Sequence, residues 1–124
     1  MYISSDKNIA GASFADTNGG AASPFMPTNL MKKNYSLNAS ADYVAFASKE
    51  AGTIVVKDDS DTVIETLTLV RSGANPNAPY KARRGTTTEG YRFFATVPVA
   101  AWYQPNSDTG SGDQDETIMY GTDE

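Results

Sequence analysis

Carboxylate side chains are the residues of this sequence best suited to chemistry, and they gather in two short stretches. In the first stretch, Asp58, Asp59 and Asp61 flank Ser60, and oxygen ligands of this kind are what Ca²⁺ requires. The stretch lacks the glycine and the distal bidentate glutamate of an EF-hand loop, and Asp and Ser are common in hairpin turns. We therefore interpret residues 58–61 as a turn, with calcium binding as the alternative, and predict no cofactor.

The second stretch, residues 108–116, alternates acids with glycines. Its tripeptide Asp108-Thr109-Gly110 matches the aspartic-protease motif in letters, but a single copy would need a homodimer to form a dyad. A glycosidase needs two carboxyl groups about 5 to 10 Å apart in a cleft, whereas the acids here lie in expected turns and the tail. A small carboxylate hydrolase therefore stays a rival hypothesis only.

Two residue types that carry much enzyme chemistry are absent. Without cysteine there is no disulfide, no thiolate nucleophile and no soft metal ligand. Without histidine the usual general base near neutral pH and the commonest transition-metal ligand are missing. The sequence therefore predicts a protein that works by binding and assembly and is not an enzyme.

Charge is unevenly distributed along this acidic chain of net charge −5. Residues 71–92 hold five basic residues against one acid, and residues 108–124 hold six acids and no base. The basic residues could bind phosphates beside stacking tyrosines, but the acidic tail is an available protein partner. We expect protein contact and no nucleic-acid binding, and predict Arg83 and Arg84 as interface residues.

The elements that must position these residues begin with a segment that lacks regular patterning. Residues 1–38 are rich in Gly, Ala and Ser and contain two prolines, which favours an extended N-terminal arm. Its apolar residues are too many for a spacer, so we expect the arm to lie on its own domain or on a neighbouring subunit. The predicted arm anchors are Phe14, Phe25, Met26, Leu30 and Met31.

From residue 39 onward the sequence pattern is typical of strands separated by turns. Six strands are expected near residues 42–48, 53–57, 62–70, 80–83, 90–99 and 117–120, with a separate aromatic segment at 100–104 and a polar acidic loop over residues 105–116. This spacing predicts an all-β domain over residues 39–124, a single small antiparallel β-sandwich or jelly-roll-like barrel. Trp102 and Tyr103 are expected to be core or interface anchors.

No apolar run is long enough for a membrane span, and residues 1–6 lack the features of a signal peptide. We therefore expect no membrane partner and synthesis in the cytoplasm.

Residues 43–104 resemble the small β-sandwich domains of structural proteins from tailed bacteriophages. The resemblance rests on Tyr43–Ser48, on an Ala-Gly-Thr turn that leads into the strand 53–57, and on Val97-Pro98-Val99 before an aromatic strand. It departs from the pattern after the acidic turn, where an Asp-Gly-x-x-Trp hairpin is replaced by Asp61–Glu65.

The resemblance implies a virion component, either a capsid decoration or cement protein or the base of a head fibre. Its expected partners are copies of itself, with a trimer favoured, and the major capsid protein or other virion proteins. The rival from a different class is a carbohydrate- or receptor-binding module, in which exposed Trp102, Tyr103 or Tyr91 stack on sugar faces.

Overall fold

The structure is a computed structural model, and it describes residues 3–15, 21–71, 73, 76–85, 87–105 and 116–123. The side chains of residues 13–15 and 21–23 are outside the described part. The elements in chain order are β1 (Ala12–Ala15), β2 (Ala21–Pro24), η1 (Thr28–Leu30), β3 (Lys32–Ser36), β4 (Ala41–Ser48), β5 (Thr53–Lys57), β6 (Val63–Thr68), β7 (Tyr80–Arg84), β8 (Arg92–Pro105) and β9 (Thr117–Ile118). Within these ranges no helix is long enough to cross a membrane.

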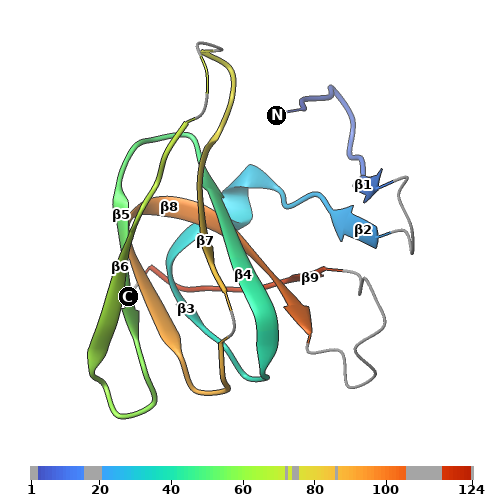
Figure 1. Cartoon of the computed structure of the whole chain (residues 1–124). Helices are drawn as coiled ribbons and strands as arrows, with labels where there is room; N and C mark the ends of the chain where they lie inside the picture. The colour runs from blue at the N-terminus through green and yellow to red at the C-terminus, as the bar shows by residue number, and fades with distance from the viewer. Residues whose placement is uncertain are drawn as a thin grey trace.

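Strand β8 organises a nearly closed antiparallel barrel (Figure 1). The first part of β8 pairs with β5 on one edge and β3 on the other, and its last part pairs with β4 and β9. Strand β6 extends the first half beyond β5, and β7 extends the second half beyond β4. The all-β prediction is confirmed, and the fold fits a sandwich or barrel.

Two seams join the halves of the barrel. Between β6 and β7, the backbones of Val70 and Lys81 exchange hydrogen bonds of 2.8 and 2.9 Å. Between β3 and the segment after β9, Asn34 and Thr122 exchange two backbone hydrogen bonds of 2.9 Å. The C-terminal residues therefore complete the wall that β3 begins.

The core follows from the period-two alternation of the strands. Val44 and Phe46 of β4 and Ile54 and Val56 of β5 are buried, while the residues between them are more exposed. The rings of Phe46 and Phe93 lie 5.2 Å apart at 57°, a tilted contact across the core. The other buried apolar residues of this cluster are Tyr35, Leu37, Ala41, Leu67, Leu69, Val99, Ala101 and Met119.

The structure differs from the predicted arm of residues 1–38. Strand β3 belongs to the barrel, and Tyr35 and Leu37 are only 3% and 2% exposed. Further upstream, β1 and β2 form a two-stranded hairpin that stands beside the barrel (Figure 1). Lysines and an asparagine lower the strand propensity of β3, so its role depends on two buried side chains two residues apart, Tyr35 and Leu37.

Strand β8 is longer than any single strand expected from the sequence, and it contains Pro98. Two steps along β3, from Lys32 to Asn34, correspond to five along β8, from Val99 to Phe94. This irregularity coincides with the change from one half of the barrel to the other, a place where proline is tolerated in a strand.

Candidate functional site

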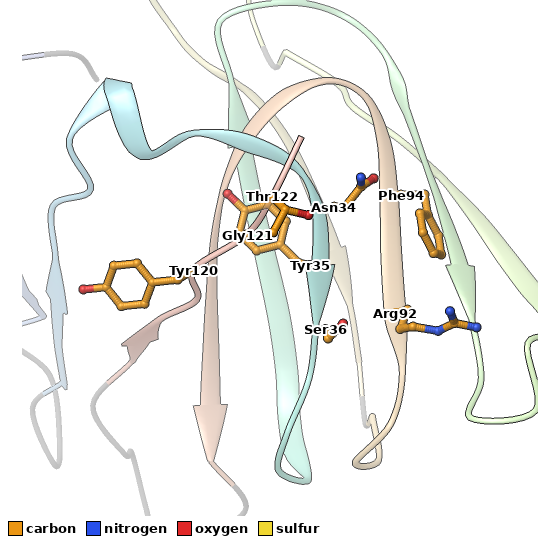
Figure 2. Close-up of a pocket in the computed structure, with 8 residues that line it drawn as sticks. All are labelled: Asn34, Tyr35, Ser36, Arg92, Phe94, Tyr120, Gly121 and Thr122. Atoms are coloured by element: carbon orange, nitrogen blue, oxygen red, sulfur yellow. The ribbon is translucent and has the colours of Figure 1, made fainter. Parts of the chain in front are cut away.

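A polar pocket of about 290 Å³ opens on the barrel wall where β3, the start of β8 and the C-terminal residues meet (Figure 2). Ser36 and Thr122 are exposed, and Phe94 and Arg92 are half-buried. The ring of Tyr120 projects away from the rest of the group and is 74% exposed. The complete lining is Asn34, Tyr35, Ser36, Arg92, Phe94, Tyr120, Gly121 and Thr122. Hydroxyl, amide and guanidinium groups beside an aromatic ring suit a small polar ligand.

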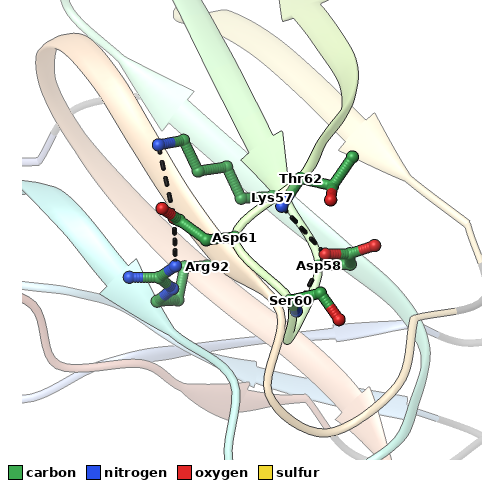
Figure 3. A network of polar contacts seen from close by, with 6 residues as sticks. All are labelled: Lys57, Asp58, Ser60, Asp61, Thr62 and Arg92. Carbon is green, nitrogen blue, oxygen red and sulfur yellow. Dashed lines mark hydrogen bonds and ion pairs between the residues drawn. The ribbon is translucent and has the colours of Figure 1, made fainter.

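Arg92 is held at the pocket by a charge network in the β5–β6 turn (Figure 3). Asp61 forms an ion pair with Arg92, and its Oδ1 lies 3.3 Å from Nζ of Lys57. The hydrogen bond and charge of Lys57, and then the charge of Arg92, lower the pKa of Asp61 below its usual value of 3.8. Asp61 is therefore ionised at neutral pH and holds these two cations in place.

The acidic turn uses its oxygens within the protein. Oδ1 of Asp58 accepts hydrogen bonds from the backbone N–H groups of Ser60 at 2.9 Å and Thr62 at 3.0 Å. The carboxylate of Asp61 forms ion pairs with Lys57 and Arg92, and its backbone is left-handed with φ of 65°. In the described ranges, no group of three acidic residues is placed to hold a metal ion. The geometry is that of a hairpin turn.

Both cations of this network also lie near the ring of Phe94. Nζ of Lys57 is 5.2 Å from the ring centroid, and the guanidinium carbon of Arg92 is 5.7 Å from it. Cation–π contacts of this kind, together with Asp61, limit where the two cationic side chains can move. This wall of the pocket is therefore preorganised, and its two cations share one carboxylate.

The predicted arm anchors lie on the segment that precedes β3. Phe25 is 42% exposed, and its backbone N–H donates to the carbonyl of Gly11 at 2.8 Å. Met26, Leu30 and Met31 are half-buried. Phe14 belongs to β1, but its side chain is outside the described residues.

Trp102 connects this segment to the barrel. Its indole Nε1–H donates a 2.8 Å hydrogen bond to the carbonyl of Pro24 in β2. The neighbouring Tyr103 points the other way and packs against the core. The two aromatic residues therefore have different roles: Trp102 fastens the hairpin, and Tyr103 supports the core.

The two arginines predicted as an interface are divided between the two faces of β7. Arg84 forms an ion pair with Glu65 across the seam to β6, and its Nε atom is buried without a hydrogen-bond partner. Arg83 is exposed, and its guanidinium carbon lies 4.2 Å from the ring centroid of Tyr43. Since adjacent residues of a strand face opposite sides, only Arg83 is presented on the outer surface.

Several exposed apolar residues were not singled out from the sequence. Ile3 and Ile9 are 54% and 62% exposed on the N-terminal segment. On the opposite side of the molecule, Val63 and Ile64 of β6 are 54% and 38% exposed. Ile3 and Ile9 are isolated apolar residues without a periodic signal, whereas Val63 and Ile64 belong to the predicted strand 62–70, which has apolar residues on both faces.

The chain was compared with models of protein families, with curated proteins and with solved structures, and no match was found in any of the three.

Proposed function

We propose that this protein is a non-enzymatic structural component of a virion, which binds neighbouring subunits and a capsid surface through its N-terminal segment. The observation that carries the proposal is the placement of residues 3–15 and 21–31. This segment lies beside the barrel and exposes Ile3, Ile9 and Phe25. Exposed apolar side chains grouped on one segment are typical of protein interfaces.

The attachment of the segment also favours this role. A hydrogen bond from Trp102 of β8 reaches Pro24 of β2, but among the described strands β1 and β2 form a sheet only with each other. Such a hairpin can contact a neighbour without disturbing the barrel. The resemblance of residues 43–104 to phage β-sandwich domains supports the virion setting.

The oligomeric state of the full-length chain tests the assembly role. Removing residues 1–38 would delete β3 and the buried side chains of Tyr35 and Leu37, so substitutions are the better design. We expect multi-angle light scattering of the wild type to give an oligomer, with three times the 13.2 kDa chain mass favoured. The combined variant Ile3→Ser and Ile9→Ser is expected to shift the protein toward the monomer.

The matched control replaces exposed apolar residues elsewhere. The variant Val63→Ser and Ile64→Ser changes two side chains of similar type in β6, across the barrel from the β1–β2 hairpin (Figure 1). It should keep the wild-type mass. A wild-type monomer at every concentration, or equal masses for wild type and the Ile3/Ile9 variant, would contradict the assembly role.

The virion setting has its own test. Mass spectrometry of purified particles of the virus that encodes this chain is expected to detect the protein. Intact particles that lack the protein would contradict the virion setting.

The polar pocket favours a second candidate function, a carbohydrate- or receptor-binding module. Asn34, Ser36 and Arg92 beside Phe94 combine hydrogen-bonding groups with an aromatic ring. Binding of a neutral saccharide on a glycan array, lost in Phe94→Ala and retained in Ile3→Ser/Ile9→Ser, would favour this candidate. Arrays without a signal would remove it.

A further inference from the structure

Four side chains of the polar pocket come from two cross-strand pairs of the β3–β8 ladder. Asn34 lies opposite Phe94, and Ser36 lies opposite Arg92. Tyr35, between the two pairs, is buried, so the four side chains belong to the outer face of the sheet (Figure 2). Side chains of opposite residues lie about 5 Å apart at Cβ. One small ligand can therefore contact groups from both strands.

The C-terminal wall of the pocket is packed closely against β3. Asn34 and Thr122 exchange two backbone hydrogen bonds of 2.9 Å. Beside them, a Cβ atom at Gly121 would lie 2.5 Å from the carbonyl oxygen of Asn34 and 2.8 Å from Cε1 of Tyr35. Tyr35 is itself fixed by the hydrogen bond from its hydroxyl to the carbonyl of Val99. The wall is therefore in place before a ligand binds, as in most small-molecule sites.

Arg92 supplies the charge of the pocket, and its guanidinium keeps donors for a ligand. Among the described residues, the guanidinium makes one hydrogen bond, from Nη2 to Oδ1 of Asp61. That oxygen also lies 3.3 Å from Nζ of Lys57. A guanidinium carries further N–H donors, and one carboxylate shared by two cations leaves one positive charge uncompensated. Arg92 can therefore bind a second anionic group.

The polar groups of the pocket stand on two sides of it. The guanidinium of Arg92 extends toward Asp61 in the β5–β6 turn, whereas Ser36, Asn34 and Thr122 stand on β3 and on the C-terminal residues (Figure 2). A bare anion would reach the guanidinium alone. A ligand that meets both sides carries an anionic group at one end and hydroxyl groups at the other.

We propose that the pocket binds the terminal sugar unit of a glycan when that unit carries a carboxylate. The proposal rests on the second candidate function above and names its ligand. The carboxylate accepts paired hydrogen bonds from Arg92, because the planar fork of a guanidinium matches a carboxylate. The sugar hydroxyls contact Ser36 and Asn34. The volume of about 290 Å³ lies at the lower end of ligand pockets, about 300 to 1,000 Å³, so the ligand is about one sugar unit.

A nuclear magnetic resonance titration with matched sugars tests the proposal. Methyl β-D-glucuronide and methyl β-D-glucoside share one ring and differ only in a carboxylate that replaces a hydroxymethyl group. Methyl α-D-galacturonide and methyl α-D-galactoside form a second pair. In at least one pair the acidic sugar is expected to bind at least about tenfold more tightly, the usual effect of a hydrogen bond to a charged group. The backbone amide signals of Ser36, Arg92 and Gly121 should shift.

The variant Arg92→Gln removes the charge and keeps hydrogen-bonding groups. The affinities for the acidic and neutral sugars should then converge, while Asp61 retains its ion pair with Lys57. Arg83→Gln is the matched control, because Arg83 is an exposed arginine of β7 outside the pocket, and it should keep the wild-type preference. Ser36→Ala changes only an exposed hydroxyl, so it should fold normally and weaken both sugars of a pair by about threefold or more.

The results separate this proposal from the candidate function on which it rests. If the acidic and neutral sugars bind equally and both are lost in Phe94→Ala, the pocket is a site for neutral sugars, and the acidic ligand is overturned alone. Acetate or inorganic phosphate that binds as tightly as the acidic sugar would assign the pocket to anions in general and overturn the sugar. Amide signals that no sugar shifts would overturn the proposal as well. A preference for the acidic sugar that disappears in Arg92→Gln and survives in Arg83→Gln supports it.

Discussion

The hydroxyl of Tyr35 donates a buried 2.5 Å hydrogen bond to the carbonyl oxygen of Val99. The same hydroxyl accepts a 3.1 Å hydrogen bond from the backbone N–H of Lys32. Lys32 and Val99 are paired residues at the irregularity between β3 and β8. A side chain thus supplies polar partners to the backbone where the regular ladder is interrupted, and it joins the two halves of the barrel there.

Tyr35→Phe should destabilise the protein while leaving the core filled. The substitution removes only the hydroxyl, and the buried carbonyl of Val99 loses its donor, which costs about 1 to 3 kcal/mol of unfolding free energy. Urea denaturation followed by circular dichroism measures this difference. Tyr120→Phe is the control, because Tyr120 is 74% exposed, and an equal loss in both variants would contradict the role of Tyr35.

The same tyrosine predicts a loss of stability at alkaline pH. Burial raises the pKa of Tyr35 above its usual value of 10.0, the hydrogen bond from Lys32 lowers it, and the charge of Asp123 raises it further. Above about pH 10 the unfolded chain releases this proton while the folded chain retains it, so stability falls as the pH rises toward the folded pKa. Urea midpoints from about pH 8 to about pH 11 should fall more steeply in the wild type than in Tyr35→Phe. Parallel curves would contradict the prediction.

Asp61→Asn should weaken the β5–β6 turn without straining it, since Asn also tolerates the left-handed backbone of this position. The pKa of Asp61 is lowered by Lys57 and then by Arg92, so its stabilising charge is present above its unfolded pKa and is lost as the pH falls through the folded value. Wild type and variant should therefore differ at neutral pH and converge in acid below the usual value of 3.8. Chemical denaturation at several pH values checks this, with Asp59→Asn as the control. A difference that persists in strong acid would point to a backbone effect instead.

Gly52→Ala should be destabilising because of close packing against β8. A Cβ atom at residue 52 would lie 2.6 Å from Oγ1 of Thr96 and 2.9 Å from Cγ2 of Val97. Thr96 cannot move freely, since its Oγ1 accepts a hydrogen bond from the N–H of Thr53 at 3.0 Å. We expect a loss of about 1 to 3 kcal/mol in a thermal or urea unfolding experiment. Gly85→Ala, where nothing lies within 4 Å, should change stability little, and similar losses in both would contradict the packing argument.

Trp102→Phe should loosen the β1–β2 hairpin more than the barrel. The substitution removes the indole donor to Pro24 but retains an aromatic ring. Limited proteolysis within residues 3–31 is expected to accelerate several-fold, while the global unfolding free energy falls by about 1 kcal/mol. Tyr103→Phe serves as the comparison, because Tyr103 packs on the core rather than on the hairpin. Unchanged cleavage in Trp102→Phe would show that other contacts hold the hairpin.

Most strands could be predicted because their signals are local. Alternation of apolar and β-branched residues locates β4 and β5, and the Asp-rich residues 58–61 mark the turn before β6. The all-β class follows from several such strands and turns in one short chain. These features are set by residues that are close together in the chain, so they can be recognised without knowing the tertiary structure.

Strand β3 and the unity of β8 depended on tertiary structure. The sequence Lys32–Ser36 has weak strand propensity, and it is a strand because β8 and Thr122 offer it backbone partners from the far end of the chain. Likewise, β8 continues through Pro98 because its residues before the proline pair with β3 and β5, and its residues after the proline pair with β4.

The sequence by itself determined the strand-forming segments, the charge asymmetry and the absence of histidine and cysteine chemistry. Only the tertiary structure decided that Arg83 faces outward while Arg84 meets Glu65, that Asp61 holds Arg92, and that Trp102 reaches Pro24. The physical reason is that strand periodicity is set within a few residues, whereas these contacts join residues 19 to 78 positions apart. These contacts form only once β8 has paired with β3, β5, β4 and β9 and the barrel has closed.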